Sequence, residues 1–193
     1  RDHIKFLNYA AANKIGVTVL DHDPDQIELL RKFGFKVFYG DATRVDLLVA
    51  AGIEKARALV IAIDNVDDSL ALVDAVRLRL PELTILARAR NVTHYYELMK
   101  RGVTLIERET FAAALLLGKQ TLRQVGFSEE RAQRAAGIFG RHNLKTLLEV
   151  APHFQDQQKV MSLTRQAREE LEDMFEGDAA AFAAAEVENG RSD

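Results

Sequence analysis

Five short runs rich in β-branched residues alternate with helix-length segments between residues 15 and 107. The runs are VTVLD (17–21), KVFYG (36–40), ALVIAI (58–63), TILARA (84–89) and VTLIE (103–107). Strands that alternate with helices predict right-handed βαβ units and a parallel sheet. VTVL and ALVIAI are apolar throughout, as expected for strands that are covered on both faces. The pattern therefore predicts an α/β fold with a doubly wound parallel sheet.

Capping signals mark where the helices between these runs begin. Asp23 is placed to cap a helix, Pro24 suits the first helical position, and Gln26 stands where a capping box requires it. Thr43 and Asp46 repeat the capping-box spacing ahead of the next helical segment. Both signals predict a helix that starts immediately after a strand, as in βαβ units.

The alternation stops after residue 108, and long helical segments follow. These are ETFAAALLLGKQTLRQVG (109–126), SEERAQRAAGIFGRHNLKTLLEVA (128–151) and the heavily charged DQQKVMSLTRQAREELEDMF (156–175). We expect a nucleotide-binding type of domain over residues 1–125 and a helical C-terminal extension over 126–177. The end of the chain, 178–193, reads as a disordered tail.

Composition excludes several classes of function. The formal net charge is −3, so the balance of charge does not favour nucleic acid as a partner. The chain has no cysteine, which excludes disulfides, thiolate metal sites and a cysteine nucleophile. None of the five histidines is paired with a second ligand or acid at a catalytic or zinc-binding spacing. We therefore expect neither an enzyme nor a metal site.

The stretch before the first run lacks the motif that this fold normally carries. In a Rossmann-like sheet, a G-x-G-x-x-G loop holds the phosphates, and an acid at the end of the second strand binds the ribose. Asp21 has the position of that acid, although a solvated acid before a helix cap explains it equally well. Residues 1–15 contain no glycine. RDHI reads like the start of a first strand and FLNYAAANKIG like the second half of the following helix, so we expect the residues between them, with the loop, to be missing.

Three longer stretches carry a resemblance to a known family. LDHDPDQIELLRKFGFKVFYGDATRVDLL, ILARARNVTHYYELMKRGV and ERETFAAALLLGKQTL resemble the cytoplasmic regulatory domain of glutathione-gated potassium efflux systems, the Kef family. The resemblance covers roughly residues 13–165. It implies a Rossmann-like KTN/RCK domain that belongs to an inner-membrane K+/H+ antiporter and lies in the cytoplasm. It also implies AMP or NAD(H) as a structural ligand of that domain.

The resemblance further implies which residues surround the nucleotide. Asp21 matches the ribose acid, the GDAT segment lies beside the adenine, and the residues after ALVIAI line the same crevice. The two arginines of ARAR alternate along a strand, so we expect them to point to opposite faces and one of them to reach the nucleotide or an interface. The implied nucleotide-binding residues are Asp21, His22, Asp41, Ala42, Thr43, Asp64, Asn65 and Arg88.

A second ligand, glutathione or its S-adducts, is implied by the same family. The matching positions are Arg108, whose guanidinium suits a carboxylate, and Asn143, whose amide suits peptide groups. From the residues alone, Arg108 would form an ion pair with Glu107, Glu109 or the partner subunit, and Asn143 would be an exposed polar residue. Phe33, which would otherwise be a core residue, matches the aromatic that a bulky adduct displaces to open the antiporter. Asn91 stands where related chains have an acid that helps to hold the resting state.

The implied partners are a second copy of the chain, the membrane antiporter domain and a flavodoxin-like quinone-reductase ancillary subunit, with no nucleic acid. Other functions remain open at this point. One is an RCK-type subunit that gates another potassium channel or uptake system by nucleotide alone, and another is an NAD-dependent oxidoreductase. A third is an interaction module that docks through the charged last helix. The charges of that helix are equally typical of a solvated helix without a partner.

Overall fold

The computed structural model describes the backbone of residues 3–189, with the side chains of residues 7–182. The chain divides into two compact units, Arg1–Glu109 and Thr110–Asp193. This division comes earlier than the expected domain end at residue 125. The reason is that the helix after residue 110 packs against the next helix of the second unit.

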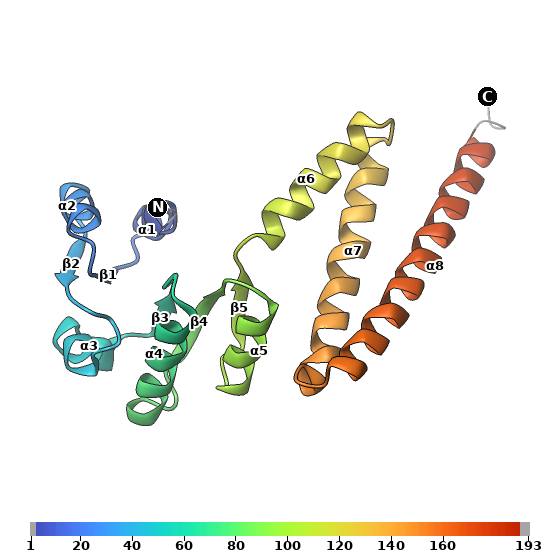
Figure 1. The fold of residues 1–193 in the computed structure, drawn as a ribbon. Helices are drawn as coiled ribbons and strands as arrows, with labels where there is room; N and C mark the ends of the chain where they lie inside the picture. Colours follow the sequence, from blue (N-terminus) through green and yellow to red (C-terminus); the bar gives the residue numbers. More distant parts are fainter. Residues whose placement is uncertain (1–2, 190–193) are drawn as a thin grey trace. The chain divides into compact units, whose positions relative to one another are not determined.

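The first unit contains parallel strands in two groups (Figure 1). β1 pairs with β2, and β4 lies between β3 and β5. The bounds are β1 Thr18–Asp21, β2 Lys36–Tyr39, β3 Ala58–Ile61, β4 Thr84–Ala89 and β5 Leu105–Arg108. All five predicted strands are therefore confirmed, and every pair is parallel. The single sheet expected from the sequence is divided instead, because among the described residues no strand pairs with both β1 and β3.

Helices follow the strands in the order that βαβ units require. They are α1 His3–Ala12, α2 Pro24–Lys32, α3 Val45–Ala51, the short 3-10 helix η1 Ile53–Lys55, α4 Val66–Arg79 and α5 Val92–Lys100. The interpretation of RDHI as the start of a strand is wrong where it can be compared, since α1 already includes His3 and Ile4. Arg1 and Asp2 lie outside the described residues.

The core of the first unit centres on the three-stranded group. Ile61 of β3 and Ile85 of β4 are 1% and 2% exposed, and Val73 of α4 and Leu98 of α5 are both 0% exposed. Burial of each such side chain stabilises the fold by about 1.5–3 kcal/mol. No residue of β1 or β2 is fully buried. The buried residues near these two strands lie on the flanking helices. The apolar strands β1 and β2 are thus only partly covered.

Two predicted helix caps are formed differently from the expected capping box. Asp23 does cap α2, since its carboxylate accepts hydrogen bonds from the backbone N–H groups of Asp25 and Gln26. The backbone N–H of Asp23, however, donates to Asp21 rather than to Gln26. At α3 the capping residue is Arg44, which makes no side-chain capping bond. Thr43 does not cap α3, because it hydrogen-bonds to Asp41 instead.

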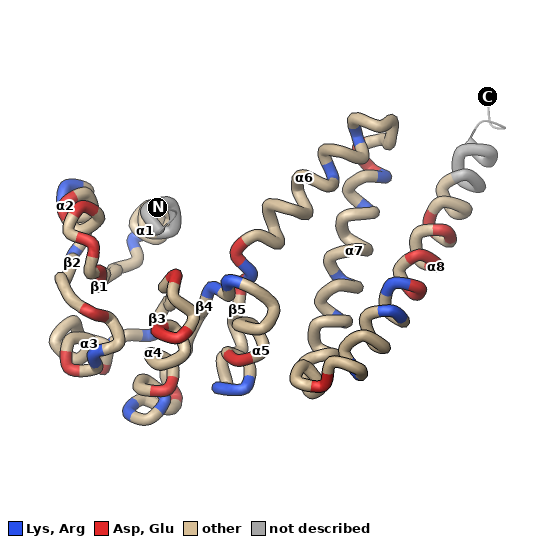
Figure 2. Tube along the Cα trace, in the orientation of Figure 1, with Lys and Arg blue, Asp and Glu red and all other residues tan. Residues whose placement is uncertain are grey.

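The second unit is a set of long helices, α6 Phe111–Gln124, α7 Glu129–Val150, the 3-10 helix η2 Ala151–His153 and α8 Gln157–Asn189. Acidic and basic residues are interspersed along the middle of α8 (Figure 2). Ion pairs join α7 to α8, from Arg134 to Asp178 and from Lys145 to Glu170 at 2.9 Å. Residues 178–189 are therefore helical rather than a disordered tail, and 190–193 lie outside the described residues. Within residues 3–189, no helix has the length and apolar character needed to span a bilayer.

Candidate functional site

Asp21 and Asp41 lie at the carboxyl ends of two paired strands. Asp21 is the last residue of β1 and pairs in register with Tyr39 of β2. The backbone N–H of Gly40 donates to the carbonyl of Asp21 at 2.9 Å, which places Asp41 one residue beyond the end of this ladder. The Oδ1 atom of Asp21 accepts the N–H of Asp23 at 2.9 Å. The carboxylate of Asp21, at the end of β1, is therefore hydrogen-bonded to the residue that caps α2.

The carboxylate of Asp41 is held by Thr43. Its Oδ1 atom accepts the Thr43 hydroxyl at 2.7 Å and the Thr43 backbone N–H at 2.8 Å. These two hydrogen bonds, with smaller attractions to His22 and Arg44, keep the pKa of Asp41 below its ordinary value. Asp41, Thr43 and the half-buried Ala42 therefore form one local turn, with a carboxylate that stays ionised and exposed. His22, also exposed, lies close enough to contribute to that field.

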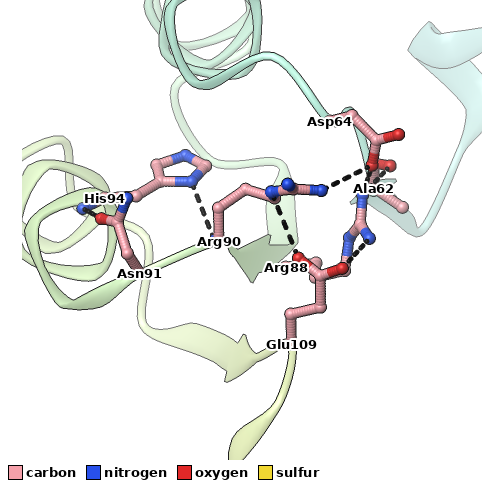
Figure 3. Close-up of polar contacts among 7 residues, drawn as sticks. All are labelled: Ala62, Asp64, Arg88, Arg90, Asn91, His94 and Glu109. Carbon is pink, nitrogen blue, oxygen red and sulfur yellow. Dashed lines mark hydrogen bonds and ion pairs between the residues drawn. The ribbon is translucent and has the colours of Figure 1, made fainter.

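Four charged side chains converge after the ends of β3, β4 and β5 (Figure 3). We call Asp64, Arg88, Arg90 and Glu109 the four-charge cluster. Arg88 pairs with Asp64 and, through Nη1, with Glu109 Oε1 at 3.2 Å. Arg90 reaches Asp64 Oδ1 at 3.4 Å through Nη1 and Glu109 Oε2 at 3.3 Å through Nε. Each arginine therefore contacts both acids.

The structure contradicts the expectation that the two arginines of ARAR point to opposite faces. β4 ends at Ala89, so Arg90 is no longer part of the alternating strand. The backbone N–H of Arg90 donates to Nδ1 of the buried His94 at 3.2 Å, and this bond turns the chain into α5. Figure 3 shows the side chain of Arg90 directed toward Asp64 and Glu109 as a result.

Asn65 has a structural role that differs from that of its neighbour. Its side-chain oxygen accepts the backbone N–H of Asp68 at 3.1 Å and so caps α4. The side chain of Asp64 is 76% exposed. Of these two predicted residues, the structure brings only Asp64 to the four-charge cluster, through its ion pairs with Arg88 and Arg90.

Two residues of this cluster were missed from the sequence. Arg90 was noted only as one of two alternating arginines, and Glu109 only as a possible ion-pair partner of Arg108. The available signal was positional, because Arg90 directly follows the predicted strand TILARA and Glu109 stands two residues after the predicted strand VTLIE. In open α/β sheets the carboxyl ends of the strands are where ligands bind.

Arg108 is the last residue of β5 and is half-buried. Burial lowers its pKa from the ordinary arginine value, while Tyr95, Tyr96 and Glu107 act in the opposite direction. Tyr95 and Tyr96 are themselves buried. A guanidinium in such a setting remains charged, because arginine does not lose its proton in proteins. It is therefore a suitable partner for a carboxylate.

The remaining predicted residues lie on helices or directly at their ends. Phe33 ends α2 and is 57% exposed, so it is not the core residue that its apolar side chain alone would predict. Asn143 belongs to α7 of the second unit and is half-buried, directly after the buried His142. Asn91 caps α5 by accepting the backbone N–H of His94 at 2.8 Å. In the described part of the chain, no group of three or more histidines and acids is arranged to hold a metal ion.

Comparison with known families covers both units. Residues 5–108 match the TrkA-N domain family, and residues 113–191 match the family described as the potassium efflux system KefB C-terminal domain. The first match ends at residue 108 and the second begins at residue 113, so the boundary between the two compact units along the chain lies between them. Both matches are to regulatory families of potassium transport rather than to an oxidoreductase.

Solved structures agree with these matches. The Kef CTD of Shewanella denitrificans, in its AMP-bound form, is 40% identical with a TM-score of 0.73, over 79% of this chain and 92% of that one. The TrkA-N domain of the Escherichia coli inner membrane protein ybaL is 20% identical with a TM-score of 0.56, over 66% and 90%. The NAD(P)-binding domain of an exopolyphosphatase-related protein from Archaeoglobus fulgidus is 18% identical with a TM-score of 0.55, over 62% and 90%.

The last two similarities concern the fold alone. The similarity to the Kef CTD of Shewanella denitrificans, together with the two family matches, shows the family. This chain belongs to the Kef family of potassium efflux systems, as a Rossmann-like TrkA-N regulatory domain followed by the helical KefB C-terminal region.

Proposed function

We propose that this chain senses ligands and thereby gates potassium efflux by K+/H+ antiport. In this proposal, glutathione inhibits the antiporter, and glutathione S-adducts activate it. AMP or NAD(H) occupies the crevice at the carboxyl ends of the strands as a structural ligand. The chain lies on the cytoplasmic side of the membrane, attached to the antiporter domain, and acts as a homodimer that can receive a flavodoxin-like quinone-reductase subunit.

The nucleotide part rests mainly on one observation, the placement of Asp21 and Asp41 at the ends of the paired strands β1 and β2. A carboxylate at a strand end can accept hydrogen bonds from ribose hydroxyls. The similar Kef CTD of Shewanella denitrificans is AMP bound, which favours the monophosphate. Thr43 and His22 stand beside Asp41 and complete the polar edge of this crevice.

The glutathione part rests on Arg108 and Asn143. A half-buried guanidinium supplies a charge-assisted fork for a glutathione carboxylate. The amide of Asn143 can both donate to and accept from a peptide group. The exposed ring of Phe33 at the end of α2 can be displaced by an adduct without opening a core.

Gating then follows as a population shift between two states of the dimer. Glutathione and its adducts share a site, and only the adduct's substituent competes with Phe33 for space. The ligand can shift the equilibrium by no more than its difference in affinity for the two states. A larger substituent should therefore favour the open state more strongly.

Isothermal titration and thermal shift of the purified chain with AMP, NAD, NADH, glutathione and a bulky S-adduct test this proposal. A ligand at 100 times its dissociation constant should add about 2.7 kcal/mol to the free energy of unfolding. Arg108→Ala should weaken glutathione binding by about tenfold or more, since it removes a charge-assisted contact. Arg57→Ala, at an exposed arginine ahead of β3, is the matched control. Full glutathione binding by Arg108→Ala would refute the assignment of this residue.

A further inference from the structure

We propose that His94 is a proton-dependent switch of the four-charge cluster. While His94 is neutral, it holds the turn that directs Arg90 toward Asp64 and Glu109. Protonation of His94 breaks this turn and releases Arg90 from both acids, whereas Arg88 stays in place. The switch needs no bound ligand, so its test is separate from that of the function proposed above.

The turn before α5 is closed by two reciprocal hydrogen bonds (Figure 3). Oδ1 of Asn91 accepts the backbone N–H of His94 at 2.8 Å, and Nδ1 of His94 accepts the backbone N–H of Arg90 at 3.2 Å. Asn91 caps α5, which makes His94 the third helical residue. A capping box has Glu or Gln at that position, as the acceptor of a backbone N–H at the start of the helix. His94 therefore takes the place of the usual acceptor.

Histidine differs from Glu and Gln in this role because its acceptor atom can be lost near neutral pH. A neutral imidazole has one accepting nitrogen, whereas both nitrogens donate in the charged form. Histidine is also the side chain that ordinarily changes its charge between about pH 5 and 8. Protonation of His94 thus places a second donor opposite the backbone N–H of Arg90, and the hydrogen bond between them is lost.

The surroundings of His94 oppose its positive charge. The residue is 1% exposed, and its Nε2 atom is buried without a hydrogen-bond partner among the described residues. Burial, reinforced by Arg88 of β4 and Arg101 after α5, lowers the pKa of His94. The first turn of α5 also lies at the positive end of the helix dipole, which disfavours a cation. A proton on His94 is therefore best accommodated when the turn opens.

The acids on the elements packed around His94 are paired with arginines. The pairs are Asp74 of α4 and Glu97 of α5 with Arg101, and Glu109 after β5 with Arg88. At the end of β5, Glu107 acts on Arg108. The two charged groups that act on His94 itself are both arginines, so they favour the neutral imidazole.

Arg90 is the member of the cluster that depends on the turn. Its side chain is 41% exposed, and it reaches Asp64 and Glu109 at 3.4 and 3.3 Å. Exposed ion pairs contribute little by themselves. The side chain of Arg88 is 23% exposed and also donates to the carbonyl of Ala62 at 2.8 Å. Loss of the turn therefore frees Arg90 and leaves Arg88 with both acids.

Release of Arg90 changes the charge at the ends of β3, β4 and β5. The closed cluster is neutral, since it has two arginines and two acids, and the loss of one arginine leaves the acids in excess. These strand ends thereby become more acidic in character as the pH falls. In the function proposed above, potassium leaves in exchange for protons, so the transported proton itself would act on this switch. Only this consequence rests on that function.

An NMR titration of the full chain between about pH 7.5 and 5 tests the switch, because this range spans the titration of histidine. The imidazole nitrogens of His94 report its protonation, and the backbone N–H and Nε–H of Arg90 report the turn and the contact with Glu109. We expect these signals to change with one midpoint below about pH 6.5. The exchange rate of the Arg90 amide, relative to an unprotected amide, should rise about tenfold or more.

Two variants separate the switch from a general effect of pH. His94→Gln keeps an acceptor that does not titrate and should abolish the change at Arg90. His153→Gln, at an exposed histidine, is the matched control and should leave that change as it is in the unmodified chain.

The outcomes decide as follows for His94 and Arg90. A common midpoint in the unmodified chain and in His153→Gln, without a change at Arg90 in His94→Gln, supports the switch. Arg90 signals that stay constant while His94 takes up its proton overturn it, as does a change at Arg90 that persists in His94→Gln. Protonation of His94 only where circular dichroism shows global unfolding also overturns it. If His94→Gln does not fold, the comparison of midpoints in the unmodified chain still decides.

Discussion

The backbone N–H of Arg90 donates a hydrogen bond to Nδ1 of His94 at 3.2 Å. This bond fixes the tautomer of His94, because an accepting Nδ1 leaves the proton on Nε2. His94 is 1% exposed, and burial, reinforced by Arg88 and Arg101, lowers its pKa. The neutral imidazole therefore holds the turn that directs Arg90 into the four-charge cluster.

Protonation of His94 should destabilise the first unit. The pKa is lower in the folded state than in the unfolded chain, where it is about 6.5. The stability that this group contributes is therefore fully present above about pH 6.5 and is lost as the pH falls toward the folded pKa. Thermal unfolding between pH 7.5 and 5 should show this loss, and His94→Asn, which can keep an acceptor near the Nδ1 position, should reduce it. His153→Asn, at an exposed histidine, should leave the pH dependence unchanged.

The cap of α5 should depend on the oxygen of Asn91 rather than on a charge. Asn91→Ala removes the acceptor of the His94 N–H and should cost about 1 kcal/mol in the free energy of unfolding. Asn91→Asp retains the cap and adds a favourable interaction with the helix dipole of about 0.3–1 kcal/mol at low salt. Denaturant unfolding of both variants measures these changes. Equal destabilisation by Ala and Asp would contradict the capping role.

The ionisation of Asp41 should depend on the hydroxyl of Thr43. That hydrogen bond is the largest cause of the lowered pKa of Asp41. Thr43→Val removes the hydroxyl and keeps the backbone N–H bond, so the pKa of Asp41 should rise toward its ordinary value. A carbon-detected NMR titration of the carboxyl groups measures it directly. Thr121→Val, which removes a hydroxyl bonded to a backbone carbonyl on α6, is the control that should leave Asp41 unchanged.

Much of the fold could be predicted because its signals are local. β-branched runs predicted all five strands, and Asp23 predicted the cap of α2. The reciprocal half of that cap could not be predicted, since the partner of the Asp23 N–H is Asp21, which precedes the helix, rather than Gln26 within it. The same sequence is compatible with a capping box and with the hydrogen bond from Asp23 to Asp21. Only the backbone conformation decides which of the two forms.

The four-charge cluster depends on how the backbone turns after β4, which the run TILARA does not show although it ends at the same residue as β4. Alternation would separate Arg88 from Arg90, but β4 ends at Ala89 and the bond from Arg90 to His94 turns the backbone. Glu109 joins them from β5, a strand neighbour that is distant in sequence. A site assembled from several strand ends therefore needs the pairing of the strands before its members can be grouped.

The end of α8 should be stabilised by the ion pair between Arg134 and Asp178. The Asp178 side chain is only 8% exposed, so Asp178→Ala leaves Arg134 without this partner across the α7–α8 contact. Amide hydrogen exchange over residues 175–189 should become faster in this variant by about fivefold or more, equivalent to about 1 kcal/mol. Asp173→Ala, at an exposed position of the same helix, should change exchange far less. Unprotected amides over 178–189 in the unmodified chain would instead support the disordered tail expected at the end of the chain, because a helix held by packing and ion pairs must slow exchange.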